Sequence, residues 1–169
     1  MIPAIGRSRG FRSMVATASV IDQLPQHIGS SFIRTSTTGF APVWNLDLLQ
    51  WRLRRPNRTY SLHISDDLVV VSTRSVVARV PFGIILGVLA RREGATVPIG
   101  RVAAVVGRHH RAPSVIHWGR TPALRVRGVP LPQRFMPSPL SLVLHPLVEG
   151  FDTGTFELGE FGFLDFDAY

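Results

Sequence analysis

Carboxylates and histidines are the residues of this chain best suited to chemistry, because it contains no cysteine. Disulfides, thiolate metal sites and a cysteine nucleophile are therefore excluded. Asp165 and Asp167 lie two positions apart in a segment that we predict to be a strand, so their side chains would share one face. Two carboxylates on one face can hold a cationic amine, or one can raise the pKa of the other for base catalysis. The structural alternative is that they pair with Arg52 or Arg54.

A second polar group, Arg108-His109-His110-Arg111, follows a predicted helix. Adjacent histidines do not project together as a pair at positions i and i+4 would, and the sequence offers no evident third ligand. We therefore interpret this group as a solvated helix end and expect no metal site. The chain contains neither a Ser-His-Asp pattern nor a glycine-rich P-loop.

Length and composition indicate one domain with a substantial core. A chain of 169 residues, of which 45% are hydrophobic, is long enough to bury about 70% of the surface that its unfolded form exposes. No apolar run reaches the ~18 residues that a membrane-spanning helix needs, so we expect no membrane span. The lack of cysteine agrees with a reducing compartment, and we expect a cytoplasmic protein.

The charge is unevenly distributed. Residues 1–148 carry all nineteen arginines and five carboxylates, a net charge of +14, whereas residues 149–169 carry six carboxylates and no base, a net charge of −6. This asymmetry favours an acidic C-terminal strand packed beside basic neighbours, or a basic body that meets an anionic ligand.

Periodicity and turn residues predict an α/β (α+β) domain. Asn45 can cap a helix, and Asp66-Asp67 marks a tight hairpin turn. A short helix is also expected near residues 15–23, within an otherwise irregular stretch. The further predicted helices cover residues 46–54 and 97–107, with one or two helical turns at 122–126. The predicted strands are 59–65, 68–72 and 75–80 (the last two either separate or continuous), 84–90, 114–118, 140–145 and 156–166.

Two segments resemble one known family. Residues 46–60, Leu-Asp-Leu-Leu-Gln-Trp-Arg-Leu-Arg-Arg-Pro-Asn-Arg-Thr-Tyr, resemble the Trp-Arg element and Tyr-led strand of a group of GNAT-like (N-acetyltransferase-like) acyl-CoA acyltransferases, often tandem-domain proteins. The ending Gly-Phe-Leu-Asp-Phe-Asp-Ala-Tyr, residues 162–169, resembles the Asp-x-Asp ending of the same group. The resemblance implies a mixed, mostly antiparallel central sheet with flanking helices over residues 44–169.

Gly10-Phe11 resembles the step that closes a GNAT domain. Residues 1–43 would then be an N-terminal arm or the remnant of a preceding domain. On this interpretation the first strand and helix of the fold would be missing, and the chain would resemble the C-terminal half of a tandem protein.

The resemblance also implies an acyl-CoA site. In GNAT enzymes the central strand splays from its parallel neighbour, its backbone binds the pantetheine arm, and the pyrophosphate lies on amides before the next helix, where unpaired N–H groups favour anions. The loop here matches the family pattern Arg-x-x-Gly-x-Gly/Ala at Arg91 and Gly94, but has Thr96 in the last small position. The alternative is a solvated turn. The residues implied in acyl-CoA binding are Val88, Leu89, Ala90, Arg91, Arg92, Gly94, Ala95 and Thr96.

His117 lies on the strand where the family approaches its acceptor, which implies a general base, with Asp165 and Asp167 beside the amine. A buried structural histidine is the alternative. The implied function is transfer from acetyl-CoA or another acyl-CoA to a small-molecule or peptide amine. A homodimer, or pairing with another GNAT-like domain, is an implied partner arrangement.

Two other functions stay open. One is a degenerate, non-catalytic GNAT-like module for assembly or interaction, in which side chains would close the gap between residues 84–90 and 114–118. The other is nucleic-acid binding, because the net charge of +8 would give salt-sensitive phosphate affinity. Trp51 and Tyr60 are expected in the core rather than as a stacking platform for bases.

Overall fold

The computed structural model describes residues 2–3, 10–29, 32–33, 39, 41–126 and 159–165. The predicted strand at residues 140–145 lies outside these residues, as does Asp167.

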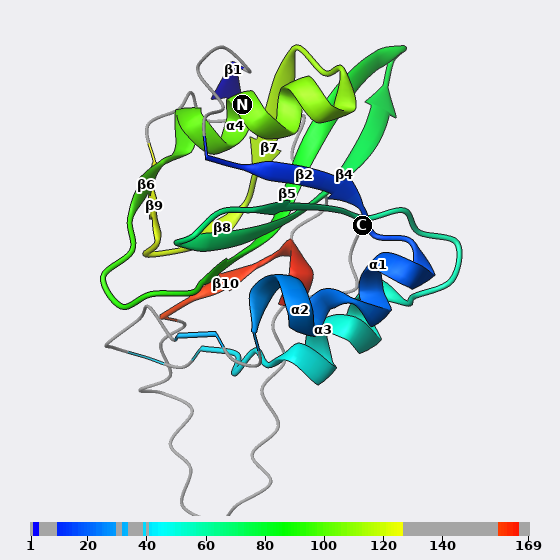
Figure 1. The fold of residues 1–169 in the computed structure, drawn as a ribbon. Coiled ribbons are helices and arrows are strands. Elements are labelled where there is room, and N and C mark those ends of the chain that lie inside the picture. Colours follow the sequence, from blue (N-terminus) through cyan, green and yellow to red (C-terminus); the bar gives the residue numbers. More distant parts are fainter. Residues whose placement is uncertain are drawn as a thin grey trace, which may run out of the picture.

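A six-stranded sheet forms the centre of the described structure, in the order β1-β7-β5-β4-β3-β2 (Figure 1). β5 and β7 run parallel, whereas every other neighbouring pair is antiparallel. The predicted α+β class with a mostly antiparallel central sheet is therefore confirmed. The strands are β1 (Ile2–Pro3), β2 (Arg12–Val15), β3 (Ser61–Ile64), β4 (Leu68–Val77), β5 (Val80–Ala90) and β7 (Ser114–His117).

Helices cover both faces of this sheet, and each face has its own hydrophobic cluster. On one side α4 (Ile99–His110) packs on residues such as Val70 and Ile85. We call this side the α4 face. On the other side, the α1–α3 face, lie α1 (Ala18–Asp22), α2 (Leu24–Ile28) and α3 (Leu46–Leu53) (Figure 1).

Two short two-stranded sheets extend this core. β6 (Val97–Pro98) pairs in parallel with β9 (Leu124–Arg125), and β8 (Gly119–Arg120) pairs with β10 (Phe161–Gly162) in antiparallel orientation. β10 leads into the 3₁₀ helix η3 (Phe163–Asp165). The prediction of helical turns at residues 122–126 was wrong, because Val97 N–H donates to Ala123 O and draws this segment into the β6–β9 pair.

The predicted start of α3 is confirmed, whereas the hairpin between β4 and β5 was not predicted. Asn45 caps α3, its side-chain oxygen accepting from Leu48 N at 2.8 Å. β4 is one strand to Val77, so most of the predicted third strand continues the second one. A two-residue turn, Ala78-Arg79, joins it to β5 with positive φ at both positions, as a type I′ hairpin turn requires.

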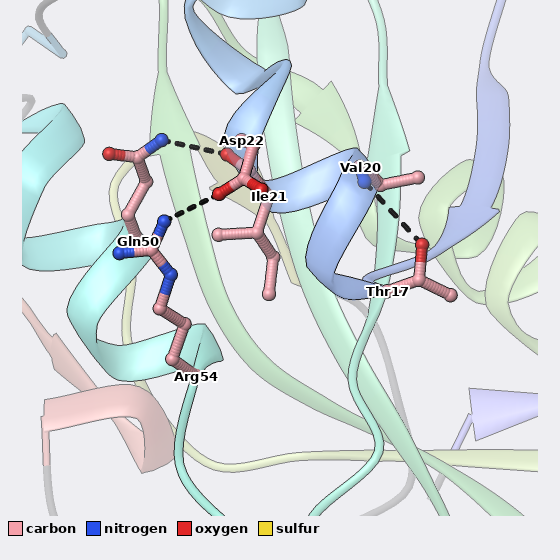
Figure 2. Close-up of polar contacts among 6 residues, drawn as sticks. All are labelled: Thr17, Val20, Ile21, Asp22, Gln50 and Arg54. Carbon is pink, nitrogen blue, oxygen red and sulfur yellow. Dashed lines mark hydrogen bonds and ion pairs between the residues drawn. The ribbon is translucent and has the colours of Figure 1, made fainter.

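Residues 12–28 are not an arm, which corrects that expectation for this part of residues 1–43. β2 pairs with β3 along its whole length, and α1 and α2 contribute buried residues to the α1–α3 face. Thr17 caps α1 through a 3.4 Å bond from Val20 N, as Figure 2 shows. In the same view Gln50 Nε2 donates to Ile21 O at 2.7 Å and Arg54 pairs with Asp22 at 2.6 Å, so α1 is tied to α3. A strand and two helices therefore precede β3 in the same packed unit.

Candidate functional site

The parallel strands β5 and β7 form a fork. They pair only from Phe82 and Ser114 to Ile85 and His117, after which β5 continues to Ala90 without β7. A β-bulge marks the same point, because Val71 pairs with Gly87 but Ser72 pairs with Ile85 on the adjacent strand β4. A bulge bends its strand and increases the local twist. β5 thus changes course where it leaves β7.

η3 and β10 fill part of this fork. A side chain at Gly87 would come within 2.8 Å of the Leu164 side chain, and one at Gly162 would come within 2.9 Å of the Leu86 carbonyl. Gly87 and Gly162 therefore permit this close packing. Leu164 is buried in the cluster of the α1–α3 face. The gap that the enzyme interpretation requires is partly closed by a side chain.

A cavity of about 60 Å³ remains at the edge of the filled part. Of the residues implied in acyl-CoA binding, Val88, Leu89 and Ala90 line it, whereas residues 91–96 do not. Its polar side chains are Thr121, Glu160 and Asp165. The remaining lining residues are Phe32, Ile33, Pro42, Val43, Trp44, Gly87, Phe161, Gly162 and Leu164.

Asp165 is fixed at the cavity by two hydrogen bonds. Its Oδ1 accepts from Trp44 Nε1 at 2.9 Å and its Oδ2 accepts from Gly162 N at 2.6 Å. Burial raises the pKa of the Asp165 carboxyl, and the charge of Glu160 raises it further, against the lowering effect of the two hydrogen bonds and of Arg52. Asp165 is thus a half-buried acid beside a second carboxyl.

The strand predicted over residues 156–166 was wrong at Asp165, which belongs to η3. Its bond back to Gly162 N closes a tight turn instead of continuing β10. Asp165 is therefore not on a strand, and the alternation that would place it on one face with Asp167 does not apply to it. Arg54, offered as a structural partner, pairs with Asp22.

His117 lies on the α4 face, since it pairs with Ile85 of that cluster, whereas Asp165 lies with Trp44 on the α1–α3 face. The structure therefore does not bring His117 and Asp165 together. Burial lowers the pKa of His117 to about 4, so its imidazole is neutral and weakly basic near pH 7.

The loop at residues 91–96 is anchored to the β3–β4 turn. Arg91 N donates to Asp67 O at 2.8 Å, and the Arg91 guanidinium donates to Ser65 O at 2.6 Å. Arg92 lies 3.6 Å from the Asp67 carboxylate. Gly94 forms the exposed tip, with φ of +68° and no atom within 4 Å of the position of an added Cβ.

A histidine–serine network on the α4 face was missed from the sequence. Ser13 Oγ lies 2.7 Å from His63 Nδ1, and Ser72 Oγ lies 2.7 Å from His63 Nε2 and 2.8 Å from His110 Nε2. His109 Nε2 lies 2.9 Å from Ser61 Oγ. The interpretation of His109 and His110 as a solvated helix end was wrong, because both rings are half-buried against the sheet and contact each other at 4.9 Å between centroids.

Burial keeps this network neutral. It lowers the pKa of His63 to about 3 and of His110 to about 4, with contributions from the neighbouring imidazoles and, at His110, from Arg74. Burial also lowers the pKa of His109. Such weak bases suit a fixed hydrogen-bond relay better than the activation of a serine nucleophile. A sequence signal did exist, since Ser61 and His63 alternate with Leu62 and Ile64 along β3.

Among the described residues, no group of three or more histidine, aspartate or glutamate side chains is arranged to hold a metal ion. In the same part of the chain, no helix is long and apolar enough to cross a membrane. Comparisons with protein-family models, curated proteins and solved structures find no match to this chain.

Proposed function

We propose that this protein is a cytoplasmic acyl-CoA-dependent N-acyltransferase of GNAT type. The observation that carries the proposal is the fork, where two parallel strands joined through α4 part at a β-bulge and leave a cavity beside Val88, Leu89 and Ala90. This is the arrangement that the family resemblance implies for the pantetheine arm. The element order agrees as well, because a strand and helices precede the antiparallel hairpins β3–β4 and β4–β5.

The phosphates of CoA would lie near residues 91–96 and the first turn of α4. That turn carries no acidic side chain, so the partial positive charge of the helix N-terminus is not offset there. Arg92 and the exposed Gly94 tip lie beside it in the sequence. Acetyl-CoA or another acyl-CoA is the proposed cosubstrate.

The amine acceptor would bind at the fork cavity, where Glu160 and Asp165 supply negative charge. The raised pKa of Asp165 brings that carboxyl closer to the range of a useful base than an ordinary aspartate. In the reaction the ammonium loses a proton to a carboxylate, the amine nitrogen bonds to the thioester carbon, and the carbon–sulfur bond breaks. The departing thiolate takes the second proton from the nitrogen, which leaves the amide and CoA. A role for His117 would require access from the α4 face.

The second candidate function is the degenerate, non-catalytic module. Leu164 favours it, because this side chain packs on Gly87 at the α1–α3 face and takes up space beside the fork cavity that an enzyme needs open. The use of the Arg91 amide by Asp67 O favours it as well, since that N–H cannot also bind a phosphate.

Calorimetric titration with acetyl-CoA and CoA at low and moderate salt tests the proposal. The variant Gly94→Asp places a negative charge at the proposed phosphate site, and Gly94→Asn is its uncharged control of the same shape. Both side chains have open space at this position and tolerate positive φ better than most residues. Saturable one-to-one binding that persists with salt, survives Gly94→Asn and weakens at least tenfold in Gly94→Asp supports the enzyme. Binding that vanishes with salt, or responds equally to both variants, supports the non-catalytic module.

A further inference from the structure

The β4–β5 hairpin extends past its neighbouring strands. β3 accompanies β4 only as far as the pair Ser61–Ser72, and β7 accompanies β5 only from the pair Phe82–Ser114 onward. Residues 73–81 therefore form a two-stranded ribbon with no strand beside it among the described residues. We call it the hairpin arm, and Figure 1 shows it projecting beyond the sheet at the end where α4 terminates.

The hairpin arm exposes basic and apolar side chains together. Arg74 and Arg79 are exposed, and neither forms an ion pair within the described part of the chain. Val76 and Val80 are 55% and 42% exposed. Arg74 and Val76 share the face of Ser72, because side chains alternate along a strand. Val80 pairs with Val77 and therefore lies on the opposite face of the ribbon.

The last turn of α4 lies beside the base of the hairpin arm. Arg74 pairs across the ribbon with Gly83, and an added Cβ at Gly83 would lie 3.7 Å from the His110 ring. The neighbouring Arg108 and Arg111 are exposed at the helix end. Four arginines thus gather at one end of the sheet, with Arg74, Arg79 and Arg111 outside any ion pair of the described residues.

The described carboxylates near the sheet ends lie elsewhere. Asp66 and Asp67 form the β3–β4 turn and Glu93 follows β5, so these three are at the opposite end of the strands from Ala78-Arg79. Glu160 and Asp165 line the fork cavity. The positive charge of the arm end is therefore not offset by these groups.

We propose that the hairpin arm and the last turn of α4 bind duplex DNA, with the ribbon in the major groove and the arginines on the phosphates. The major groove of B-form DNA admits a two-stranded ribbon, whereas that of A-form RNA is too narrow. Arginine binds phosphate oxygens through two parallel hydrogen bonds. This surface is separate from the fork, so the proposal stands independently of the acyltransferase function.

Fluorescence anisotropy with a labelled duplex of about 20 base pairs tests the proposal over a salt series from about 50 to 200 mM. The double variant R74S/R79N removes two arm charges, and asparagine tolerates the positive φ at position 79. The control R12S/R125S removes two exposed arginines outside the hairpin arm, Arg12 at the other end of the central sheet and Arg125 in β9. We expect the arm variant to weaken binding at least tenfold and to reduce the slope of log affinity against log salt by about 2, since each phosphate contact contributes about 0.9. The control should bind like the parent.

Equal losses in the two double variants would overturn the proposal, because binding would then follow net charge alone. Absence of duplex binding at the lowest salt would also overturn it. So would arm-dependent binding that is tighter to an A-form RNA duplex or to a polyglutamate peptide, since the partner would then be RNA or an acidic protein. Circular dichroism of each variant establishes that the fold is retained.

Discussion

His63 and His110 hydrogen-bond to the same hydroxyl group. Ser72 Oγ lies 2.7 Å from Nε2 of His63 and 2.8 Å from Nε2 of His110. A hydroxyl has one proton, so it can donate to only one of the two imidazoles, and the other must then donate its N–H to the oxygen. The tautomers of the two rings are therefore coupled through Ser72, and Ser13 extends the coupling from the other side of His63. If both rings were protonated, Ser72 Oγ would accept from both of them, and its own proton would have no acceptor within this group.

The free energy of unfolding should begin to decrease already near pH 6.5 as the solution is acidified. The pKa of His63 is lowered to about 3 and that of His110 to about 4, both below the ordinary value of 6.5. Below pH 6.5 the unfolded chain therefore binds protons that the folded chain does not, and stability falls as the pH decreases from 6.5 toward 4. His63 alone contributes a slope of about 1.4 kcal/mol per pH unit, and the more exposed His110 contributes less. Urea unfolding at pH 7, 6 and 5 measures this slope.

The variant His63→Gln separates this contribution from that of the carboxylates. Glutamine cannot titrate, so the free energy of unfolding of the variant should decrease more slowly between pH 7 and 5. At pH 7 the variant should be less stable than the parent, because the bonds of the imidazole to Ser13 and Ser72 are lost. Asp165, whose pKa is raised, acts in the opposite direction and is present in both proteins. Identical slopes in the parent and the variant would show that His63 is not held neutral by the fold.

Removing the shared hydroxyl should cost more than removing the terminal one. Ser72 is fully buried, so Ser72→Ala leaves ring nitrogens of His63 and His110 without a partner and should destabilise the protein by about 1–3 kcal/mol. Ser13 is exposed, so water can replace its hydroxyl in Ser13→Ala and the loss should stay below about 1 kcal/mol. Both changes delete one oxygen from a partner of His63. Chemical denaturation at pH 7 compares them, and a Ser13→Ala loss as large as that of Ser72→Ala would contradict the assigned burial.

The features predicted correctly from the sequence depend on residues that are close together along the chain. The Asn45 cap and the Asp66-Asp67 turn involve partners within a few positions. The histidine–serine network joins Ser13, His63 and residues of α4, and this proximity arises only when β2, β3 and α4 meet. Residue spacing around His109 and His110 alone therefore gave the wrong interpretation.

The fork was expected from a family resemblance, and its closure was the expectation for a degenerate module, but the residues that fill it were not identified. The apolar run at residues 84–90 has no alternation that would reveal the bulge between the Val71 and Ser72 pairings. Leu164 follows a glycine and an aromatic residue, a pattern that equally suits a continued strand. The bond from Gly162 N to Asp165 closes the turn into η3, where Leu164 packs on Gly87.

Trp51 and Tyr60, both expected in the core, should respond differently to substitution. Trp51 is 68% exposed, so Trp51→Ala should change the free energy of unfolding by no more than about 0.5 kcal/mol. Tyr60 is 1% exposed, and its hydroxyl has no hydrogen-bond partner among the described residues. Tyr60→Phe should therefore be neutral or stabilise the protein by up to about 1 kcal/mol. Thermal and urea unfolding measure both, and a loss above about 1 kcal/mol in Tyr60→Phe would reveal a partner for the hydroxyl.

Gly119 controls the position of the acidic side of the fork cavity. It has φ of +118°, and an added Cβ would collide with the carbonyl oxygen of Phe161, the residue beside its partner in the β8–β10 pair. Gly119→Ala should therefore separate β10 from β8 and release the bond between Asp165 and Trp44, while β5 and α4 stay packed.

Gly94→Ala is the matched control for Gly119→Ala, because φ at Gly94 is +68° but nothing lies within 4 Å of its added Cβ. Backbone strain alone should cost about 1–2 kcal/mol in the control. The collision should raise the loss in Gly119→Ala clearly above that value and should alter tryptophan fluorescence as Trp44 loses its bond. Equal stability and equal fluorescence of the two variants would mean that the β8–β10 pair does not hold Asp165 at the cavity. The amine site proposed there would then lack its fixed carboxylate.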